Sequence, residues 1–452
     1  MASKQEITIS SDSRLYFSDE IVIKETDGGR YLCVSVNTAN WIVLESPVQV
    51  EMLNHLISGK TIHEVIDYLK GNVRSDFFDL LSRLMARQFA TTQENGPEIR
   101  REDNSKSLNI YLTQSCNLRC KHCFMHSGTK LEKELNRDQW INVLDEFKSL
   151  GGTNVTFTGG EPLMNHSFED IVKHASRIGL KVTVLTNGIL WTDAIIDRLY
   201  GHIDQIQISL DGVNEQSNAM VRGKGVFDVV KDNILKIANK GYRTSVATTF
   251  TLENLNEETK NQYAELVNDL KQNCKNPIFF KITKKMLAGR DTIYTHEEAN
   301  NYYEKVIEIE RTVDNNSREN NFMEGHEPNF VDANCGFGGI SISADGNVYF
   351  CNRIIEVDCY GNVLDKPLSF FHDIGIRLCS QTDVDHVLPC RDCYLRYICG
   401  GGCRIDDFNF KGRIKNSDYD KIRRLESMES CVGKMEQRMI EGFDYKFDFN
   451  TK

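Results

Sequence analysis

The sequence lacks the features that would place it in a membrane or on a nucleic acid. No segment approaches the ~20 consecutive apolar residues that span a bilayer, and the opening MASKQEITISSDSR lacks the apolar core of a secretory signal. We therefore expect a cytoplasmic protein with no membrane partner. The formal net charge is -11. Because binding to phosphates draws on a surplus of Lys and Arg, we expect no nucleic-acid partner.

Disulfide bonds are not expected either. The chain has 14 cysteines in 452 residues. Thiols of a cytoplasmic protein stay reduced, so metal binding or catalysis explains this number better than a disulfide framework. A chain of this length exceeds the size at which a single core usually stops growing, which favours two to three domains.

Residues 1–92 are typical of a small winged-helix-like domain. Beta-rich runs come first, in RLYFSDEIVIKE and GRYLCVSVN. Helical spacing of apolar residues follows, in VQVEMLNHLISG, IHEVIDYLKG and DFFDLLSRLMARQF. A polar linker is predicted over 93–107.

Residues 108–310 alternate between strands and helices. Six strands are predicted, at LNIYLT, NVTFTG, KVTVLTN, QIQISLD, TSVATTF and PIFFKI. This order indicates an α/β fold with a parallel sheet covered by helices. Chemistry in such folds collects on the loops that leave the carboxyl ends of the strands. A bridging segment over 311–334 and a cysteine-rich domain over 335–452 are predicted to follow.

Three cysteines lie directly after the first of these strands, in CNLRCKHC: Cys116, Cys120 and Cys123. Three thiolates can hold a 4Fe-4S cluster by three irons and leave the fourth iron open. A zinc site is the alternative, with His122 or His126 as a fourth ligand.

The spacing resembles the C-x3-C-x2-C motif of the radical S-adenosylmethionine (SAM) superfamily. The resemblance implies a partial (β/α)6 TIM-like barrel, in which the open iron binds SAM and its reductive cleavage gives a 5'-deoxyadenosyl radical. Later segments, in the family's order, imply further SAM contacts. Glu161 would meet the methionyl amino group, Ser209 and Asp211 the ribose and methionine, and Arg222 the methionyl carboxylate. The complete set is Gly159, Gly160, Glu161, Asn187, Ser209, Asp211 and Arg222.

Each of these segments also has a purely structural explanation. Gly159-Gly160 and Asn187-Gly188 would serve as turns, Ser209 and Asp211 as turn or cap residues, and Arg222 as a surface charge. The segment KITKKMLAGR would carry the backbone that faces the adenine, although it departs from a strict glycine pattern.

A second cysteine array resembles the SPASM domain of radical enzymes that act on peptides. It comprises Cys335, Cys351, the run CRDCYLRYICGGGC and Cys431. The resemblance assigns two auxiliary 4Fe-4S clusters, which makes three clusters in all. The outer cluster would be held by Cys390, Cys393, Cys399 and Cys431, and the inner cluster by Cys335, Cys351 and Cys403. Two zinc sites are the alternative.

The inner cluster has only three assigned ligands. Either Cys359 or Cys379 completes it, or one iron stays open. An open iron would bind a substrate thiolate and favour thioether formation, whereas a closed cluster would favour electron transfer and carbon-carbon bonds. Cys33 and Cys274 are expected to be buried apolar thiols.

The front domain resembles the precursor-peptide recognition domain of enzymes that mature ribosomally made peptides. Such domains add a leader peptide as a strand to the edge of their sheet. DNA binding is less favoured, because IHEVIDYLKG carries Glu64 and Asp67 against one lysine. The expected partners are a precursor peptide with a leader and an electron donor such as flavodoxin or ferredoxin.

The sequence thus predicts an oxidoreductase that abstracts a hydrogen from a core-peptide residue and forms an intramolecular cross-link. The bond would be a thioether or a carbon-carbon bond such as Lys-Trp. One alternative is a sulfatase-type maturase that oxidises Cys or Ser to formylglycine. An alternative from a different class is a zinc-stabilised winged-helix regulator.

Overall fold

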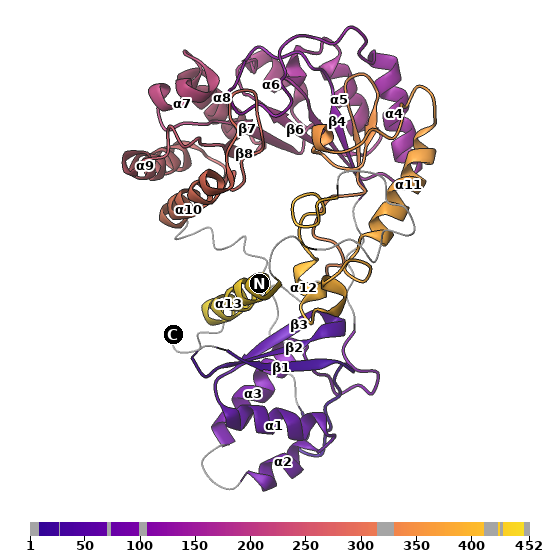
Figure 1. Cartoon of the computed structure of the whole chain (residues 1–452), viewed down its shortest axis with the longest axis vertical. Coiled ribbons are helices and arrows are strands. Elements are labelled where there is room, and N and C mark those ends of the chain that lie inside the picture. The colour runs from indigo at the N-terminus through magenta and orange to yellow at the C-terminus, as the bar shows by residue number, and fades with distance from the viewer. Residues whose placement is uncertain are drawn as a thin grey trace.

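The computed structural model describes residues 9–26, 28–69, 74–98, 106–313, 330–410, 424 and 428–446. Residues 99–105 of the predicted linker and 314–329 of the predicted bridging segment lie outside these ranges. Figure 1 shows a large sheet with its helices at one end of the molecule and a small sheet with its helices at the other. The helices α12 (Arg396–Cys399) and α13 (Met428–Lys446) lie between the two lobes. The predicted division into domains stays a prediction.

The front lobe consists of strands followed by helices, in the predicted order. Its antiparallel sheet has the order β1 (Ile21–Glu25), β2 (Tyr31–Ser35) and β3 (Asn40–Leu44). The helices are α1 (Pro47–Ile57), α2 (Ile62–Tyr68) and α3 (Arg74–Ala86). Ser46 caps α1 by accepting from the Gln49 backbone, and Thr61 forms a capping box with Glu64 at α2.

The large sheet confirms the predicted α/β fold. Six strands run parallel in chain order: β4 (Ser107–Tyr111), β5 (Asn154–Thr158), β6 (Lys181–Thr186), β7 (Gln205–Ser209), β8 (Arg243–Thr248) and β9 (Ile278–Ile282). The sheet also has two strands that the sequence did not predict. The strand β10 (Ile340–Ile342) pairs in parallel with β4, and β11 (Val348–Tyr349) pairs antiparallel with β10.

Helices cover one face of this sheet. They are α4 (Arg137–Ser149), α5 (Phe168–Arg177), α6 (Asp193–Leu199), α7 (Glu215–Arg222), α8 (Phe227–Lys240), α9 (Glu257–Asn273) and α10 (His296–Val313). Alternate strand residues such as Val155 and Phe157 are buried in the same core as Trp140 on α4. The residues between them, such as Thr156, are only partly buried and face the other side of the sheet.

The C-terminal elements divide between two hydrophobic cores. The helix α11 (Leu368–Gln381) contacts α4, and its Phe371 belongs to the core of the large sheet. The helices α12 (Arg396–Cys399) and α13 (Met428–Lys446) contact the front lobe instead, as Figure 1 shows. Ile398 and Met439 are buried in the core of that lobe. Among the described helices, none combines the length and the apolar character needed to cross a membrane.

Candidate functional site

The structure brings the first three cysteines together on the loop that leaves β4. The Cys116 N–H donates to the Gly128 carbonyl at 3.1 Å, and the Cys123 N–H donates to the Cys120 carbonyl at 3.3 Å. Burial raises the pKa of the Cys116 thiol to about 11, and the neighbouring charges of Glu161, Cys120 and Cys123 add to this rise. A thiol with a raised pKa, such as that of Cys116, would lose its proton when it binds metal.

Gly159 and Gly160 pack against this cysteine loop. The Gly160 N–H donates to the Thr113 carbonyl at 2.7 Å. A Cβ atom on Gly159 would lie 2.4 Å from the Thr113 carbonyl oxygen, and one on Gly160 would lie 2.1 Å from that of Ser115. Only glycine permits so close an approach of two loops. In this structure the two glycines let the β5 loop support the chain just before Cys116, and their implied contact with SAM stays a prediction.

Glu161 links the carboxyl ends of β5 and β6. It is fully buried. One carboxylate oxygen accepts from the Thr186 hydroxyl at 2.8 Å, and the other accepts from the Asn187 N–H at 2.7 Å. Burial raises the pKa of Glu161 to about 7, although these hydrogen bonds lower it. Asn187 continues the connection, because its side-chain amide donates to the Asn117 side-chain oxygen at 2.8 Å and to the Cys116 sulfur at 3.9 Å.

Asp211 and Arg222 form a buried ion pair beside the cysteines. The Arg222 Nε lies 2.7 Å from Asp211 Oδ2, and the side chains are 7% and 1% exposed. Burial favours a raised pKa for Asp211, but the charges of Arg222 and His122 hold that pKa below its usual value. β7 ends at Ser209, so Asp211 lies in the loop beyond the strand. The surface-charge explanation of Arg222 is therefore wrong.

His122 completes this group, although sequence reasoning considered it only as a zinc ligand. Its Nε2 lies 2.7 Å from Asp211 Oδ2. Its Nδ1 is buried and has no hydrogen-bond partner in the part of the chain that the structure describes. A buried polar atom without a partner is expected where a ligand binds. The signal in the sequence was the position of His122 between Cys120 and Cys123.

Arg290, in the segment that follows β9, hydrogen-bonds to the same loop, and sequence reasoning did not identify it. Its guanidinium donates to the Cys120 carbonyl at 3.2 Å and also to the Ser127 carbonyl. The Asp291 N–H donates to the Lys121 carbonyl at 2.8 Å. The end of KITKKMLAGR therefore lies against the backbone of the cysteine loop.

The inner group of the second array, Cys335, Cys351 and Cys403, also comes together. A side-chain hydrogen bond with Cys403 lowers the pKa of the Cys335 thiol. Burial raises the pKa of Cys351, and the charge of Cys403 contributes to that rise. The two candidate fourth ligands have carbonyl partners: Cys359 donates to Gly361 at 3.5 Å, and Cys379 donates to Phe337 at 3.4 Å.

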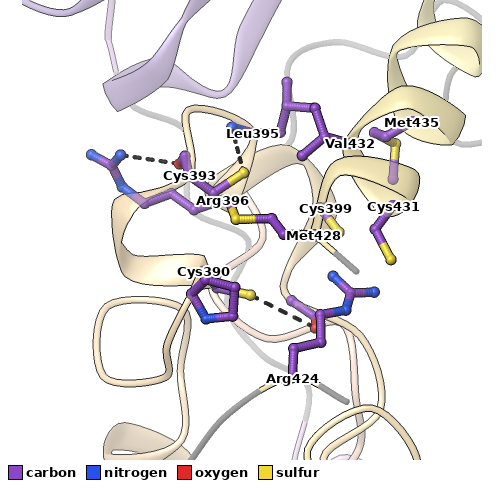
Figure 2. Close-up of a pocket in the computed structure, with 12 residues that line it drawn as sticks. Cys390, Cys393, Leu395, Arg396, Cys399, Arg424, Met428, Cys431, Val432 and Met435 are labelled. Carbon is purple, nitrogen blue, oxygen red and sulfur yellow. Dashed lines mark hydrogen bonds between the residues drawn. The ribbon is translucent and has the colours of Figure 1, made fainter. Parts of the chain in front are cut away.

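The outer group surrounds one pocket. Figure 2 shows Cys390, Cys393, Cys399 and Cys431 around it, with Arg424 at its side. Cys431 comes from α13, and the other three come from the segment that contains α12. Burial raises the pKa of Cys390 to about 11, and the charge of Arg424 opposes this rise.

Backbone N–H groups point at a sulfur in all three groups. In the first group, the Leu118 N–H donates to the Cys116 sulfur at 3.5 Å. In the inner group, the Arg353 N–H donates to the Cys351 sulfur at 3.4 Å and the Asp406 N–H to the Cys403 sulfur at 3.5 Å. In the outer group, the Leu395 N–H donates to the Cys393 sulfur at 3.4 Å. Such donors stabilise the sulfurs of iron-sulfur clusters. No three His, Cys, Asp or Glu side chains of the described ranges are arranged to hold a single metal ion. The sets of three or four thiols with amide donors fit iron-sulfur clusters.

Residues 110–268 match the family model of the radical SAM superfamily. The chain therefore contains a radical SAM domain, at the place where the parallel sheet and the first cysteine loop lie. Among curated proteins it is similar to the sporulation killing factor maturation protein SkfB of Bacillus subtilis, with 29% identity over 285 residues. This match covers 60% of the chain and 64% of SkfB.

The chain is also similar to the mycofactocin maturase MftC of Mycolicibacterium smegmatis. The two are 33% identical over 149 residues, which are 32% of the chain and 38% of MftC. The matches thus span less than two thirds of the length of either curated relative.

Two solved structures support the fold. Streptococcus suis SuiB bound to S-adenosylmethionine aligns over 88% of the chain and 97% of its own length, with a TM-score of 0.50 and 16% identity. The enzyme anSMEcpe with bound AdoMet aligns over 75% of the chain and 96% of its own length, with a TM-score of 0.52 and 16% identity. The predicted α/β fold with its mostly parallel sheet is confirmed.

Proposed function

We propose that the protein is a radical SAM enzyme that modifies a ribosomally made precursor peptide. The observation that carries the proposal is the gathering of Cys116, Cys120 and Cys123 at the carboxyl edge of the parallel sheet, beside the buried pair of Asp211 and Arg222. The similar proteins SkfB and MftC are named as a maturation protein and a maturase, which supports a peptide substrate.

The three cysteines would hold a 4Fe-4S cluster. When bound, this cluster supplies the electron that cleaves SAM into methionine and a 5'-deoxyadenosyl radical. Arg222 would bind the methionyl carboxylate through its two terminal nitrogens, because its Nε is already held by Asp211. Ser209 and Asp211 would position the ribose and methionine, and Asn187 would fix the loop that carries Cys116.

Gly159, Gly160 and Glu161 would position the methionyl amino group. Both carboxylate oxygens of Glu161 already accept hydrogen bonds from the protein, so its side chain would orient the β5 loop. The backbone carbonyls of that loop would then accept from the amino group. This orienting role agrees with the complete burial of Glu161.

The front lobe would hold the leader of the precursor as an added strand. At the outer edge of β3, the Val43 carbonyl accepts from Arg83 at 3.1 Å and the Trp41 carbonyl accepts from Arg87 at 3.4 Å. A strand added along β3 would have to displace both arginines. Holding the leader would raise the concentration of the core peptide near the radical site.

The product is proposed to be a thioether cross-link. The three inner cysteines come together, whereas Cys359 and Cys379 hydrogen-bond to carbonyl groups, and this arrangement supports an open iron for a substrate thiolate. The substrate would lose one hydrogen atom to the radical, one electron to the inner cluster and one proton to solvent. These losses balance the formation of one C–S bond from a C–H and an S–H group.

The test is anaerobic incubation of the reconstituted protein with SAM, reduced flavodoxin and candidate precursor peptides translated from any short reading frames beside its gene. We expect 5'-deoxyadenosine, a peptide lighter by two hydrogen atoms and a cysteine that no longer reacts with iodoacetamide. A cross-linked peptide whose cysteines all still react would show a carbon-carbon bond. Exchange of a cysteine sulfur for oxygen, or loss of two hydrogen atoms that leaves a hydrazide-reactive aldehyde and no cross-link, would show formylglycine formation from Cys or Ser. Colourless protein that forms no 5'-deoxyadenosine would contradict the proposal.

A further inference from the structure

One arginine, Arg353, contacts two of the three inner cysteines, one through its backbone and one through its side chain. The Arg353 backbone N–H donates to the Cys351 sulfur at 3.4 Å, and its guanidinium Nη1 donates to the Cys403 sulfur at 3.8 Å. The side chain is only 14% exposed. A single residue thus supplies two N–H donors to sulfurs that come from segments about fifty positions apart in the chain.

Two carboxylates fix this guanidinium. Its Nη1 lies 2.6 Å from Asp406 Oδ2, and its Nε donates to Glu356. Asp406 in turn donates its backbone N–H to the Cys403 sulfur at 3.5 Å. The carboxylate that holds Arg353 therefore lies on the same loop as the thiol that Arg353 contacts, which fixes the donor relative to the sulfur.

A lysine from the barrel completes the network. The Lys285 Nζ lies 2.7 Å from Asp406 Oδ2, and Lys285 lies on the segment that follows β9. Its neighbour Lys284 forms a separate ion pair with Glu310 at 2.7 Å. The two lysines are adjacent in sequence and only one joins the network, so Lys284 provides a matched control.

We propose that Arg353 is a positioning residue that sets the reduction potential of the inner auxiliary cluster. This inference rests on the proposed function, because it assumes that Cys335, Cys351 and Cys403 hold that cluster. N–H donors to cluster sulfurs stabilise the reduced, more negative state and so raise the potential. The carboxylates of Asp406 and Glu356 balance the cations Arg353 and Lys285. The intact network therefore carries no net charge, and Arg353 acts through its placed donor, whereas loss of Lys285 would leave one carboxylate charge unbalanced.

The consequence concerns the proposed oxidation step. A substrate radical can pass its electron to the inner cluster only if the potential of that cluster lies above that of the radical. By raising that potential, Arg353 would favour electron transfer from the substrate. Lys285 would act through Asp406. Without the lysine, the Asp406 carboxylate would place more negative charge beside Cys403, which would lower the potential of the inner cluster.

The test is a redox titration followed by electron paramagnetic resonance. It uses full-length protein carrying C116A, C120A and C123A, in which the two auxiliary clusters are the iron centres. We expect R353Q to shift the inner potential to more negative values, R353K to shift it less, and K285Q to give the smallest shift in the same direction. K284Q should leave it unchanged, and the outer cluster serves as the internal reference.

An inner potential that stays the same in R353Q, with its iron content intact, would overturn the inference. If R353Q does not assemble the inner cluster, R353K and K285Q decide, and unchanged potentials in both would overturn it as well. Parent protein without auxiliary iron would instead overturn the part of the proposed function that assigns Cys335, Cys351 and Cys403 to an electron-accepting cluster. The two failures are therefore distinguishable by the iron content of the parent protein.

Discussion

The two cysteine groups of the C-terminal region pack against different lobes of the molecule. Cys351 of the inner group is buried in the core of the large sheet. Cys393 of the outer group is buried in the core of the front lobe. Yet Cys399 and Cys403, which belong to different groups, are four positions apart. The comparison teaches that this region joins two cores, and that metal binding at either group would stabilise a different lobe.

Apolar burial carries most of the contact between the outer group and the front lobe. Leu395 and Ile398 are 1% and 6% exposed within that core. Burying each such side chain contributes about 1.5–3 kcal/mol. The ion pair of Lys24 and Glu436, at 2.7 Å, links the same parts, but Lys24 is 46% exposed. An exposed pair of this kind contributes about 0–1 kcal/mol.

The largest expected effect comes from removing the thiols of the first cysteine loop, which should leave the inner and outer groups intact. Replacing Cys116, Cys120 and Cys123 with alanine should abolish SAM cleavage, because no thiol remains to hold the SAM-binding cluster. The iron of the inner and outer groups should persist. The measurements are 5'-deoxyadenosine by chromatography and iron by elemental analysis. Retained 5'-deoxyadenosine formation would contradict the assignment of these ligands.

The next effect concerns the packing that supports this loop. In Gly160→Ala the new Cβ would lie 2.1 Å from the Ser115 carbonyl oxygen, so the loop that carries Cys116 must move. Overpacking of this kind costs about 1–3 kcal/mol. We expect SAM affinity, measured by equilibrium dialysis, to fall at least ~10-fold, which corresponds to about 1.4 kcal/mol.

Gly433→Ala on α13 is the matched control, because a Cβ there meets no atom within 4 Å. It should bind SAM as the unchanged protein does. Equal affinities for all three proteins would show that the approach of the two loops does not matter for the site.

The smallest effect tests whether the outer and inner groups stabilise different lobes. The buried thiol of Cys33 reports on the opening of the front lobe. Burial raises the pKa of this thiol to about 12, so it should react with iodoacetamide only when the front lobe opens. Replacing Cys390, Cys393 and Cys399 with alanine should accelerate its labelling ~10-fold if the core loses about 1.4 kcal/mol. Labelling is located by peptide mass spectrometry.

Replacing Cys335, Cys351 and Cys403 with alanine is the corresponding change at the inner group. It should leave the labelling of Cys33 unchanged, because these thiols pack on the core of the large sheet. Equal acceleration in both variants would show that the two groups stabilise the molecule as one unit.

Local patterns were enough to predict much of the fold and part of the site. The alternation of strands and helices predicted the six parallel strands, because period and turn residues are local properties. The close spacing of Cys116, Cys120 and Cys123 likewise places them on one loop whatever surrounds them. The strands β10 and β11 were missed, since runs of three and two residues carry no readable period.

The sequence by itself therefore determined the order of the elements and the presence of a radical SAM motif. Only the tertiary structure decided that Asp211 pairs with Arg222 and His122, that Gly160 packs on Ser115, and that Arg353 reaches Cys403. These contacts join residues from different elements across the folded chain. No period or spacing encodes them, because they arise only when packing brings separate loops to the same place.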